Sequence, residues 1–436
     1  MSDGDRRLAS VRSAVESHFS VAGGELAVGG VPVSRLAAEF GTPLFAYDAG
    51  VLRRRLEQLR AAVPAVDVYY SVKANPNPAV VGVFVRAGAG CEIASGAEYV
   101  RARAGGADPA RIVFAGPGKT DAELRLVVEG GIGEIHAESM EELDRLAALG
   151  RPVDVALRFN PGAEASGGAM RMGGKPAPFG FDEESLEEVL AAVDARPTLR
   201  FRGVHMFAGT QILDASVLVG QWRHAVGVAR RVSELRGAPP ETVDLGGGLG
   251  IPYFPHEEPL DLEVVREEAG ALFREVAADP LLRGTRFILE PGRFLAGPAG
   301  VYLCRVLAVK ESRGERFCVL DGGMNHHLAA SGNLGQVIKR DYPVLNASRA
   351  DAGDLRDTAV VGPLCTPLDT LARKALLPDT RAGDLVAVLQ SGAYGLTASP
   401  VGFLSHPMPA EALVDGGAAR LVRARGTFEQ PVVPLP

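Results

Sequence analysis

The length, composition and charge of the chain limit the classes of protein to which it can belong. Its 436 residues can form one large barrel and a second domain, and a hydrophobic fraction of 47% is ordinary for a soluble globular protein. The formal net charge is −7, and no basic cluster is dense enough to indicate a nucleic-acid-binding surface. No run approaches the roughly 20 apolar residues of a membrane-spanning helix. The charged start of the chain lacks the apolar core of a signal peptide, so we expect a cytoplasmic protein.

Short elements precede the main body of the chain. Residues 1–22 have the charged, amphipathic pattern of a short helix or a loose arm. Residues 24–34 alternate around a Gly-Gly turn, a pattern typical of a β-hairpin. A helix is expected over 35–40 and a strand within 41–48, where Asp48 is placed to cap the next helix.

From residue 48 to about 290, short apolar segments alternate with amphipathic ones. Eight such strands, each followed by a helix, favour a (β/α)8 TIM barrel, because a doubly wound sheet requires fewer strands and a glycine-rich phosphate loop after the first one. Strands are expected at 66–70, 89–93, 111–114, 133–136, 153–159, 201–207, 241–245 and 285–290. Helices are expected between them, including 79–87, 97–104, 121–129, 140–149, 185–195 and 216–235.

After residue 295 strand-like segments follow one another with few helices. This change indicates a separate all-β domain over 291–436, which strands within 24–47 are expected to join, leaving 1–23 as an arm and 48–290 as the barrel. The loop 162–178, rich in Gly, Ala and Met, is expected to be flexible. The strands of the β domain are expected at 300–309, 315–320, 358–362, 384–389, 411–415 and 419–426.

Lys73 follows the first expected barrel strand, within the sequence YYSVKANPNP (69–78). The Asn and Pro residues after it indicate a turn, so the side chain is expected at the C-terminal end of the strand. An ammonium flanked there by apolar residues is expected to be partly desolvated, which frees the amine for Schiff-base chemistry. A lone lysine of this kind is more often a surface residue, so the interpretation depends on the other strand ends.

Other barrel strands end in residues that can bind a ligand or take part in catalysis. His205 ends one strand, and three glycines, 246–248, follow another and let backbone N–H groups approach an anion. Glu290 and Arg293 place a carboxylate and a guanidinium after the last strand. Each feature alone has a plain structural explanation, such as a tight turn or an ion pair. Together with a Schiff-base lysine they are the parts needed to hold pyridoxal phosphate, whose ring nitrogen a carboxylate keeps protonated.

The chain resembles the fold-type III pyridoxal-phosphate decarboxylases, the group of diaminopimelate, ornithine and arginine decarboxylases. The resemblance runs from about residue 24 to the C-terminus, with many motifs in the order typical of the family. These motifs are YYSVKANPNP, GCEIASGAEY, LRFNPG, FGFD, DLGGGLGIPY, EPGRFL, DGGMNHHL, GPLCTPLD, QSGAYG and MPAEALV.

The resemblance implies a role for each matching residue. Lys73 would bond to the cofactor, His205 would stack on its ring, and Glu290 would pair with its ring nitrogen. Cys365 would protonate the product carbon in the active site of a partner subunit, which implies an obligate homodimer with shared active sites.

The resemblance also implies contacts around the cofactor. Arg293 would touch the phosphate in some relatives and the substrate carboxylate in others. Glu92 takes the place of an Asp that relatives carry near the cofactor, so its longer side chain makes this role less direct. The phosphate would be contacted by Thr210, Gly246, Gly247, Gly248 and Tyr394.

The cysteines and histidines outside these motifs have simpler interpretations. Cys91, Cys304 and Cys318 lie in strand-like segments and are expected in the core, and no CxxC or metal-ligand spacing is present. Only the GPLC motif and the nearby Asp369 favour a catalytic Cys365. His326 and His327 are adjacent, so in a strand at most one of them would face the substrate. The histidines expected at the surface or in loops are His18, His224 and His256.

The expected substrate contacts depart from the pattern of the family. Diaminopimelate decarboxylases carry a Glu directly after the catalytic Cys, and ornithine decarboxylases carry an Asp there, whereas this chain has Thr366. The Arg and Tyr that follow the DAGMN-type motif are also missing at that spacing; Arg340 and Tyr342 come later. A site that lacks a charged partner for the far end of the substrate discriminates poorly in favour of substrates that carry a charge there. These differences argue against free diaminopimelate or ornithine as the substrate.

A subgroup of the family from biosynthetic gene clusters shares GGMNHHLA, NLGQVIKR and CTPLD with this chain. It includes the butirosin enzyme, which decarboxylates a glutamyl group on an acyl carrier protein. We therefore expect an α-decarboxylase of an amino-acid or aminoacyl substrate, with a carrier protein as a candidate partner. The alternatives are a diaminopimelate decarboxylase, an amino-acid racemase, against which Glu290 argues, and a non-catalytic homologue, against which Lys73 and Cys365 argue.

Overall fold

The computed structural model describes residues 2–162, 170–171, 177–207, 209–334, 336 and 339–427. The chain forms two compact units. The first contains Met1–Arg54, Pro252–Glu257 and Leu295–Pro436, and the second contains Arg55–Ile251 and Glu258–Phe294. The sequence predicts 252–257 as part of the barrel, whereas the structure groups this segment with the first unit. The loop 162–178, expected to be flexible, lies mostly outside the described residues.

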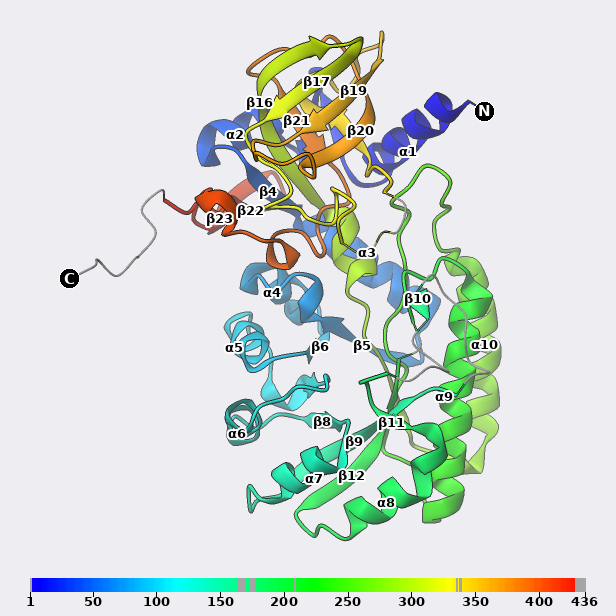
Figure 1. Ribbon diagram of the computed structural model, residues 1–436. Helices are drawn as coiled ribbons and strands as arrows, with labels where there is room; N and C mark the ends of the chain where they lie inside the picture. Colours follow the sequence, from blue (N-terminus) through cyan, green and yellow to red (C-terminus); the bar gives the residue numbers. More distant parts are fainter. Residues whose placement is uncertain are drawn as a thin grey trace, which may run out of the picture. The chain divides into compact units, whose positions relative to one another are not determined.

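The second unit is a closed (β/α)8 barrel of parallel strands, which confirms the predicted fold class (Figure 1). The barrel closes because its first strand along the chain, Val66–Ser71, pairs in parallel with its last, Arg286–Leu289, and Glu134–Ala137 pairs in parallel with Val153–Asn160. Each strand lies within two residues of its expected range. In spatial order the strands are β5 (Val66–Ser71), β6 (Gly90–Ile93), β7 (Ile112–Phe114), β8 (Glu134–Ala137), β9 (Val153–Asn160), β12 (Leu199–Met206), β14 (Thr242–Asp244) and β15 (Arg286–Leu289).

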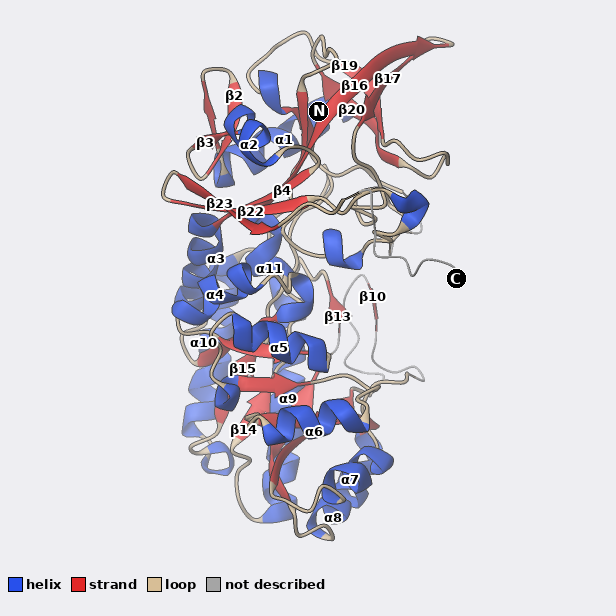
Figure 2. Ribbon diagram, turned by 90° about the vertical axis from the view of Figure 1, so that its left-hand side faces the viewer, coloured by secondary structure: helices blue, strands red, loops and turns tan. Residues whose placement is uncertain are grey.

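Helices follow the barrel strands and lie outside them (Figure 2). Several begin at a polar cap; at one of them the Thr120 side chain accepts from Glu123 N, and Glu123 in turn accepts from Thr120 N. The single tryptophan, Trp222, is 1% exposed within the longest of these helices. The helices are α3 (Ala49–Ala62), α4 (Pro78–Arg86), α5 (Gly96–Ala104), α6 (Asp121–Glu129), α7 (Met140–Ala147), α8 (Leu186–Asp194), α9 (Ala215–Arg236) and α10 (Leu262–Ala278), with the short strands β10 (Met170–Arg171), β11 (Phe181–Asp182) and β13 (Gly209–Thr210) between α7 and α9.

The first unit is organised around a mixed sheet in the order β20-β19-β17-β16-β4-β22-β23, to which β21 and β18 are attached beside β16. Asp48, at the end of β4, accepts hydrogen bonds from Gly50 N at 2.7 Å and Val51 N at 3.1 Å, as expected for the cap of α3. The sheet strands are β4 (Leu44–Asp48), β16 (Gly300–Ser312), β17 (Glu315–Leu320), β18 (Val344–Asn346), β19 (Arg356–Val361), β20 (Thr370–Leu377), β21 (Leu385–Val388), β22 (Ala410–Asp415) and β23 (Ala418–Arg423).

The N-terminal hairpin belongs to the same compact unit as residues 295–436, in line with the expected grouping, although it has a sheet of its own. Strands β2 (Glu25–Val28) and β3 (Val31–Pro32) form it, but they pair with β1 (Ser20–Ala22) in a separate three-stranded sheet and do not join the large one. Leu26 and Val28 are buried in one apolar cluster with Val301 and Leu303 of β16, so the hairpin packs into the core of the unit. The other helices of the chain are α1 (Asp3–His18), α2 (Val33–Phe40) and the short α11 (Arg293–Ala296).

Two strands of the sheet were not expected. β18 is only three residues long, too short for an alternating pattern to show. β20 contains Arg373 and Lys374 side by side, and both are exposed because the pairing of β19 with β20 shifts register. A bulge of this kind breaks the two-residue period on which strand prediction depends. Within the described residues, no helix is long and apolar enough to cross a membrane.

Close approach of two barrel strands generates a stability prediction at Gly203. A Cβ at this position in β12 would lie 1.8 Å from the carbonyl oxygen of Thr242 in β14, whereas a Cβ at Gly227 in α9 would meet no atom within 4 Å. Gly203→Ala should lower the free energy of unfolding by on the order of 3 kcal/mol through overpacking. Gly227→Ala should raise it by about 0.5–1 kcal/mol through helix propensity. Urea unfolding of both variants checks this, and equal effects would contradict it.

Candidate active site

Lys73 lies in a 3-10 turn, Val72–Ala74, directly after β5, as expected. Its Nζ lies 2.9 Å from both carboxylate oxygens of Glu92, which is buried on β6. Ser71 Oγ donates to the same carboxylate at 2.5 Å and orients it. The Lys73 side chain is 45% exposed, so more than half of it is shielded from water, and the expectation of partial desolvation stays a prediction. Lys73 and Glu92 therefore form an ion pair at the end of β5.

Four buried side chains meet where β8, β12, β14 and β15 end. His205 Nδ1 lies 2.9 Å from His136 Nδ1, and His205 Nε2 lies 3.5 Å from Glu290 Oε2. His136 Nε2 lies 3.1 Å from Glu134 Oε1 and 3.9 Å from Asp244 Oδ2. Parallel strands bring their carboxyl ends to one face of a barrel, so residues far apart in the chain come together here.

The charge state of this cluster follows from burial and from its neighbours. Burial opposes ionisation of Glu290, but His205, His136 and the Lys73 ammonium outweigh this effect and hold the pKa of Glu290 well below its ordinary value. Burial and the adjacent Glu290 carboxylate raise the pKa of Asp244 well above its ordinary value. The pair therefore keeps one proton, on Asp244, and Glu290 carries a negative charge.

Three buried atoms of the cluster have no hydrogen-bond partner among the described residues: His205 Nε2, Asp244 Oδ2 and Glu290 Oε1. Buried polar atoms without a partner are costly, so they indicate that a ligand completes the site. An ionised carboxylate accepts a hydrogen bond from a protonated ring nitrogen, and an imidazole face packs on an aromatic ring. The donor and acceptor set therefore fits a pyridine ring.

The glycine loop 246–248 brings backbone close to backbone. Gly246 and Gly248 have φ of 70° and 94°, and a Cβ on Gly247 would lie 2.5 Å from the Glu290 carbonyl oxygen. Ile212 N donates to Gly248 O at 2.9 Å, which fixes the loop beside the short strand that contains Thr210. Only glycine allows these approaches, and such a loop can also present N–H groups to a phosphate.

Arg293 begins α11 next to the turn of Lys73. Ser71 N donates to Pro291 O at 3.3 Å, and a Cβ on Gly292 would lie 2.8 Å from the Cβ of Ala74. The EPGR and SVKA segments are therefore packed against each other. Lys73, Glu92, His205, Glu290 and Arg293 all belong to the second unit.

The remaining expected site residues lie in the first unit. Cys365 is exposed, whereas Cys91, Cys304 and Cys318 are buried, as expected. Asp369 accepts from Met324 N at 2.6 Å and Leu364 N at 2.8 Å, so it shapes the loop that carries Cys365 and Thr366. Tyr394 has a φ of 53°, in the left-handed region.

His326 lies in a turn and His327 directly after it, outside any strand, so the strand alternation considered for this pair does not apply. His326 Nδ1 lies 3.0 Å from Tyr302 Oη and its Nε2 lies 3.1 Å from Pro407 O. His327 Nε2 lies 3.0 Å from Ser391 Oγ. Both rings are buried with protein partners, which favours a structural role over contact with substrate.

Sequence reasoning missed His136, although it ends the expected strand 133–136. It also missed the buried ion pairs Lys119–Glu142 and Arg158–Glu138, each with an N–O distance of 2.7 Å. His136, His205, Asp244 and Glu290 could offer one metal ligand each within 4.8 Å of one another. No sequence spacing signals this group, because each residue comes from a different strand end.

Buried histidines make stability depend on pH. Burial lowers the pKa of His205 to about 4, below the unfolded value of 6.5, so the unfolded chain binds more protons between these values. Stability should therefore fall as pH decreases from 6.5 towards 4, by on the order of 3 kcal/mol from this residue. His205→Gln should flatten the pH dependence of the urea midpoint, and His256→Gln, at an exposed position, should not. Equal profiles for wild type and His205→Gln would contradict the assignment.

Comparison with known proteins agrees with this geometry. Residues 49–297 match the family model for the pyridoxal-binding domain of pyridoxal-dependent decarboxylases. The L-glutamyl-[BtrI acyl-carrier protein] decarboxylase of Niallia circulans is 40% identical over 92% of this chain and 95% of its own length. The diaminopimelate decarboxylase of Zymomonas mobilis is 33% identical over 94% of this chain and 96% of its own length.

Solved structures show the same fold. Diaminopimelate decarboxylase from M. jannaschii, in complex with L-lysine, superposes with a TM-score of 0.85 at 25% identity, covering 96% of this chain and 98% of the other. The lysine/ornithine decarboxylase of Vibrio vulnificus in complex with putrescine gives a TM-score of 0.70 at 25% identity over 84% and 93% of the two chains. The pyridine-binding cluster and the sequence matches lead to one conclusion: the chain belongs to the pyridoxal-phosphate-dependent decarboxylases of fold type III.

Proposed function

We propose that this decarboxylase acts on an aminoacyl group tethered to an acyl carrier protein, in a specialised biosynthetic pathway of the cytoplasm. The observation that carries the proposal is Thr366, which stands directly after Cys365 where a distal charge clamp would require an acid. A substrate whose far end is masked in a thioester needs no such clamp. The 40% identity to a glutamyl-carrier-protein decarboxylase supports this substrate class.

The environment of Arg340 and Tyr342 supports the same choice. Arg340 NH1 lies 2.6 Å from His256 Nε2, and its guanidinium stacks 3.9 Å from the centroid of the Phe254 ring. Tyr342 is buried with its ring centroid 4.5 Å from that of Tyr253. Both side chains have partners within the first unit, so neither is a ready replacement for the missing distal clamp of diaminopimelate decarboxylases.

Each residue of the barrel site has a task in the reaction. Pyridoxal phosphate, when bound, supplies an electron sink for the pair left behind when the Cα–carboxylate bond breaks. Lys73 would hold the cofactor through its amine. Glu290, ionised in its buried cluster, would accept a hydrogen bond from the protonated ring nitrogen and so favour an electron-poor ring. His205 would orient the ring, and the glycine loop and Thr210 would hold the phosphate.

Cys365 returns a proton from Sγ to Cα after CO2 leaves, and we propose that it comes from a second copy of the chain. Its side chain is exposed, which suits a residue that serves another subunit. Exposed apolar side chains lie in the same unit: Leu334, Leu368, Phe403 and Leu404, 40–50% exposed. Asn333 Nδ2 donates to Leu368 O at 3.1 Å, so two of the exposed positions lie on neighbouring segments. Neighbouring exposed apolar residues such as Leu334 and Leu368 are typical of an interaction surface.

A substrate comparison tests the proposed substrate. The cofactor-loaded enzyme should decarboxylate glutamyl or another aminoacyl carrier protein at least 100-fold more efficiently than free glutamate, lysine, ornithine, arginine or diaminopimelate, because binding energy from the carrier is absent for the free acids. Mass spectrometry would follow the loss of CO2. Turnover of free diaminopimelate as fast as of any tethered substrate would refute the proposal.

Mixing two inactive variants tests the shared site. Lys73→Ala and Cys365→Ala homodimers should each lose nearly all activity. After unfolding and refolding together in equal amounts, about a quarter of the wild-type activity should return, because half of the dimers are mixed and each has one intact site. A mixture that stays inactive, although the two chains form mixed dimers by native mass spectrometry, would place Cys365 in its own subunit's site.

A further inference from the structure

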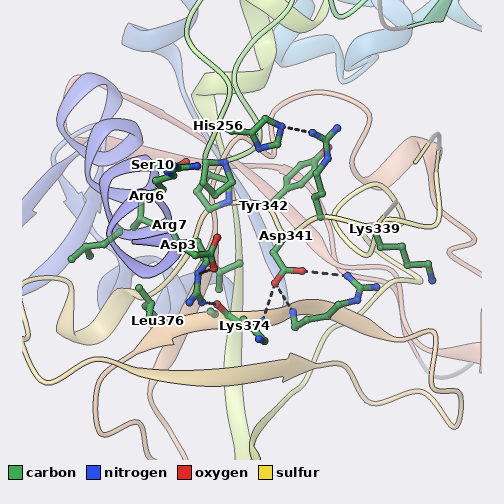
Figure 3. Close-up of a pocket in the computed structure, with 18 residues that line it drawn as sticks. Asp3, Arg6, Arg7, Ser10, His256, Lys339, Asp341, Tyr342, Lys374 and Leu376 are labelled. Atoms are coloured by element: carbon green, nitrogen blue, oxygen red, sulfur yellow. Dashed lines mark hydrogen bonds and ion pairs between the residues drawn. The ribbon is translucent and has the colours of Figure 1, made fainter. Parts of the chain in front are cut away.

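The first unit contains a cavity of about 380 Å3 that none of the assigned roles uses (Figure 3). This volume lies within the range of small-ligand sites. The cavity is formed by α1, residues 255–256, residues 339–344 and the edge strand β20. We refer to it as the basic cavity.

The lining of the basic cavity has a strong excess of positive charge, although the whole chain carries −7. Only Asp3 and Asp341 oppose it among the lining residues. The cationic members are Arg6, Arg7, Lys339, Arg340, Arg373 and Lys374.

Both acids are already engaged in holding the walls. Asp341 Oδ2 accepts from the backbone N–H groups of Arg373 at 2.7 Å and Lys374 at 2.9 Å, which satisfies the edge of β20. Asp3 lies 3.0 Å from Arg7 Nε, and Arg7 NH1 also lies 2.8 Å from Asp357 of β19. Arg7 therefore links α1 to the sheet. Its positive charge is balanced by these two acids and is not available to a ligand.

Three cations remain without an acidic partner. Within the part of the chain that the structure describes, Arg6, Lys339 and Lys374 have no carboxylate within 4 Å. Lys339 Nζ donates to the neutral side-chain oxygen of Asn333. Three cations of the lining are thus available to an anion with several oxygens, which can accept charge-assisted hydrogen bonds from more than one donor.

The remainder of the lining is apolar. Leu8 and Val11 of α1, Val344 of β18 and Leu376 of β20 face the same cavity. A free inorganic anion would leave this surface without a partner, whereas an organic phosphate would contact both parts.

We propose that the basic cavity binds a phosphate group attached to an organic chain. One source of this chemistry is the phosphopantetheine arm of a carrier protein, in which case the inference deepens the proposed function and rests on it. The other source is a free phosphorylated metabolite. The segment 252–257, which supplies part of the cavity wall, follows the glycine loop 246–248 closely in the chain.

Calorimetry on the cofactor-loaded enzyme tests the site without depending on turnover. 4′-Phosphopantetheine should bind at least tenfold more tightly than pantetheine, and added salt should weaken the difference. Lys374→Glu and Arg6→Glu should each weaken binding tenfold or more. The matched controls are Lys310→Glu and Arg420→Glu, two exposed cations on β16 and β23, which should change affinity less than twofold. Equal binding of the two ligands, or an equal loss in the controls, would overturn the proposal.

Kinetics then distinguish the two sources. If the carrier arm occupies the cavity, Lys374→Glu should raise KM for the tethered substrate about tenfold, leave kcat unchanged and leave melting temperature unchanged. If KM for the tethered substrate is unaffected while phosphopantetheine binding is lost, the phosphate site stands and the carrier arm is rejected as its source. If the enzyme acts only on free amino acids, the proposed function fails. The calorimetric comparison still tests independently whether the basic cavity binds an organic phosphate.

Discussion

The negative charge of Glu290 is the constraint around which the barrel site is built. A buried carboxylate stays ionised only if neighbouring groups compensate it. Here Asp244 holds a proton, two imidazoles lie within 4 Å, and the glycine loop is fixed to Glu290 through Glu290 N and Gly246 O at 2.8 Å. The same arrangement leaves one carboxylate oxygen without a hydrogen-bond partner and so available to a ring nitrogen. The charge state of the cluster and its fit to a protonated ring nitrogen therefore both centre on Glu290, at the end of β15.

Much of the barrel can be predicted from sequence because its signals are local. Most barrel strands are short, largely apolar segments bounded by turns, and most of the helices between them begin at a polar cap. The β unit is less predictable because long-range pairing decides its strands. β20 shows this: its two adjacent cations are accommodated by a register shift against β19, which no pattern within 370–377 reveals. The N-terminal hairpin is predictable as a hairpin. Where it packs is not, because this depends on the apolar side chains of β16 that it buries.

The site shows the same limit at the level of single residues. Lys73, His205 and Glu290 are recognisable because each stands in a motif with a known chemical task. His136 ends a predicted strand but has no motif, and its importance comes from a ring 2.9 Å away and 69 positions later in the chain. The buried ion pairs of Lys119 and Arg158 are equally hard to predict, because no local sequence pattern distinguishes a buried cation from an exposed one. The basic cavity draws its charges from three separate segments, so no single stretch of the chain appears basic.

Trp222 gives the molecule a built-in optical reporter. It is the sole tryptophan of the chain and is fully packed within α9, so its emission depends on the integrity of the barrel unit alone. The indole N–H has no hydrogen-bond partner among the described residues, which places the ring in an apolar setting that water would change on opening. Fluorescence of the barrel and circular dichroism of the whole chain would therefore separate if the two units open at different denaturant concentrations.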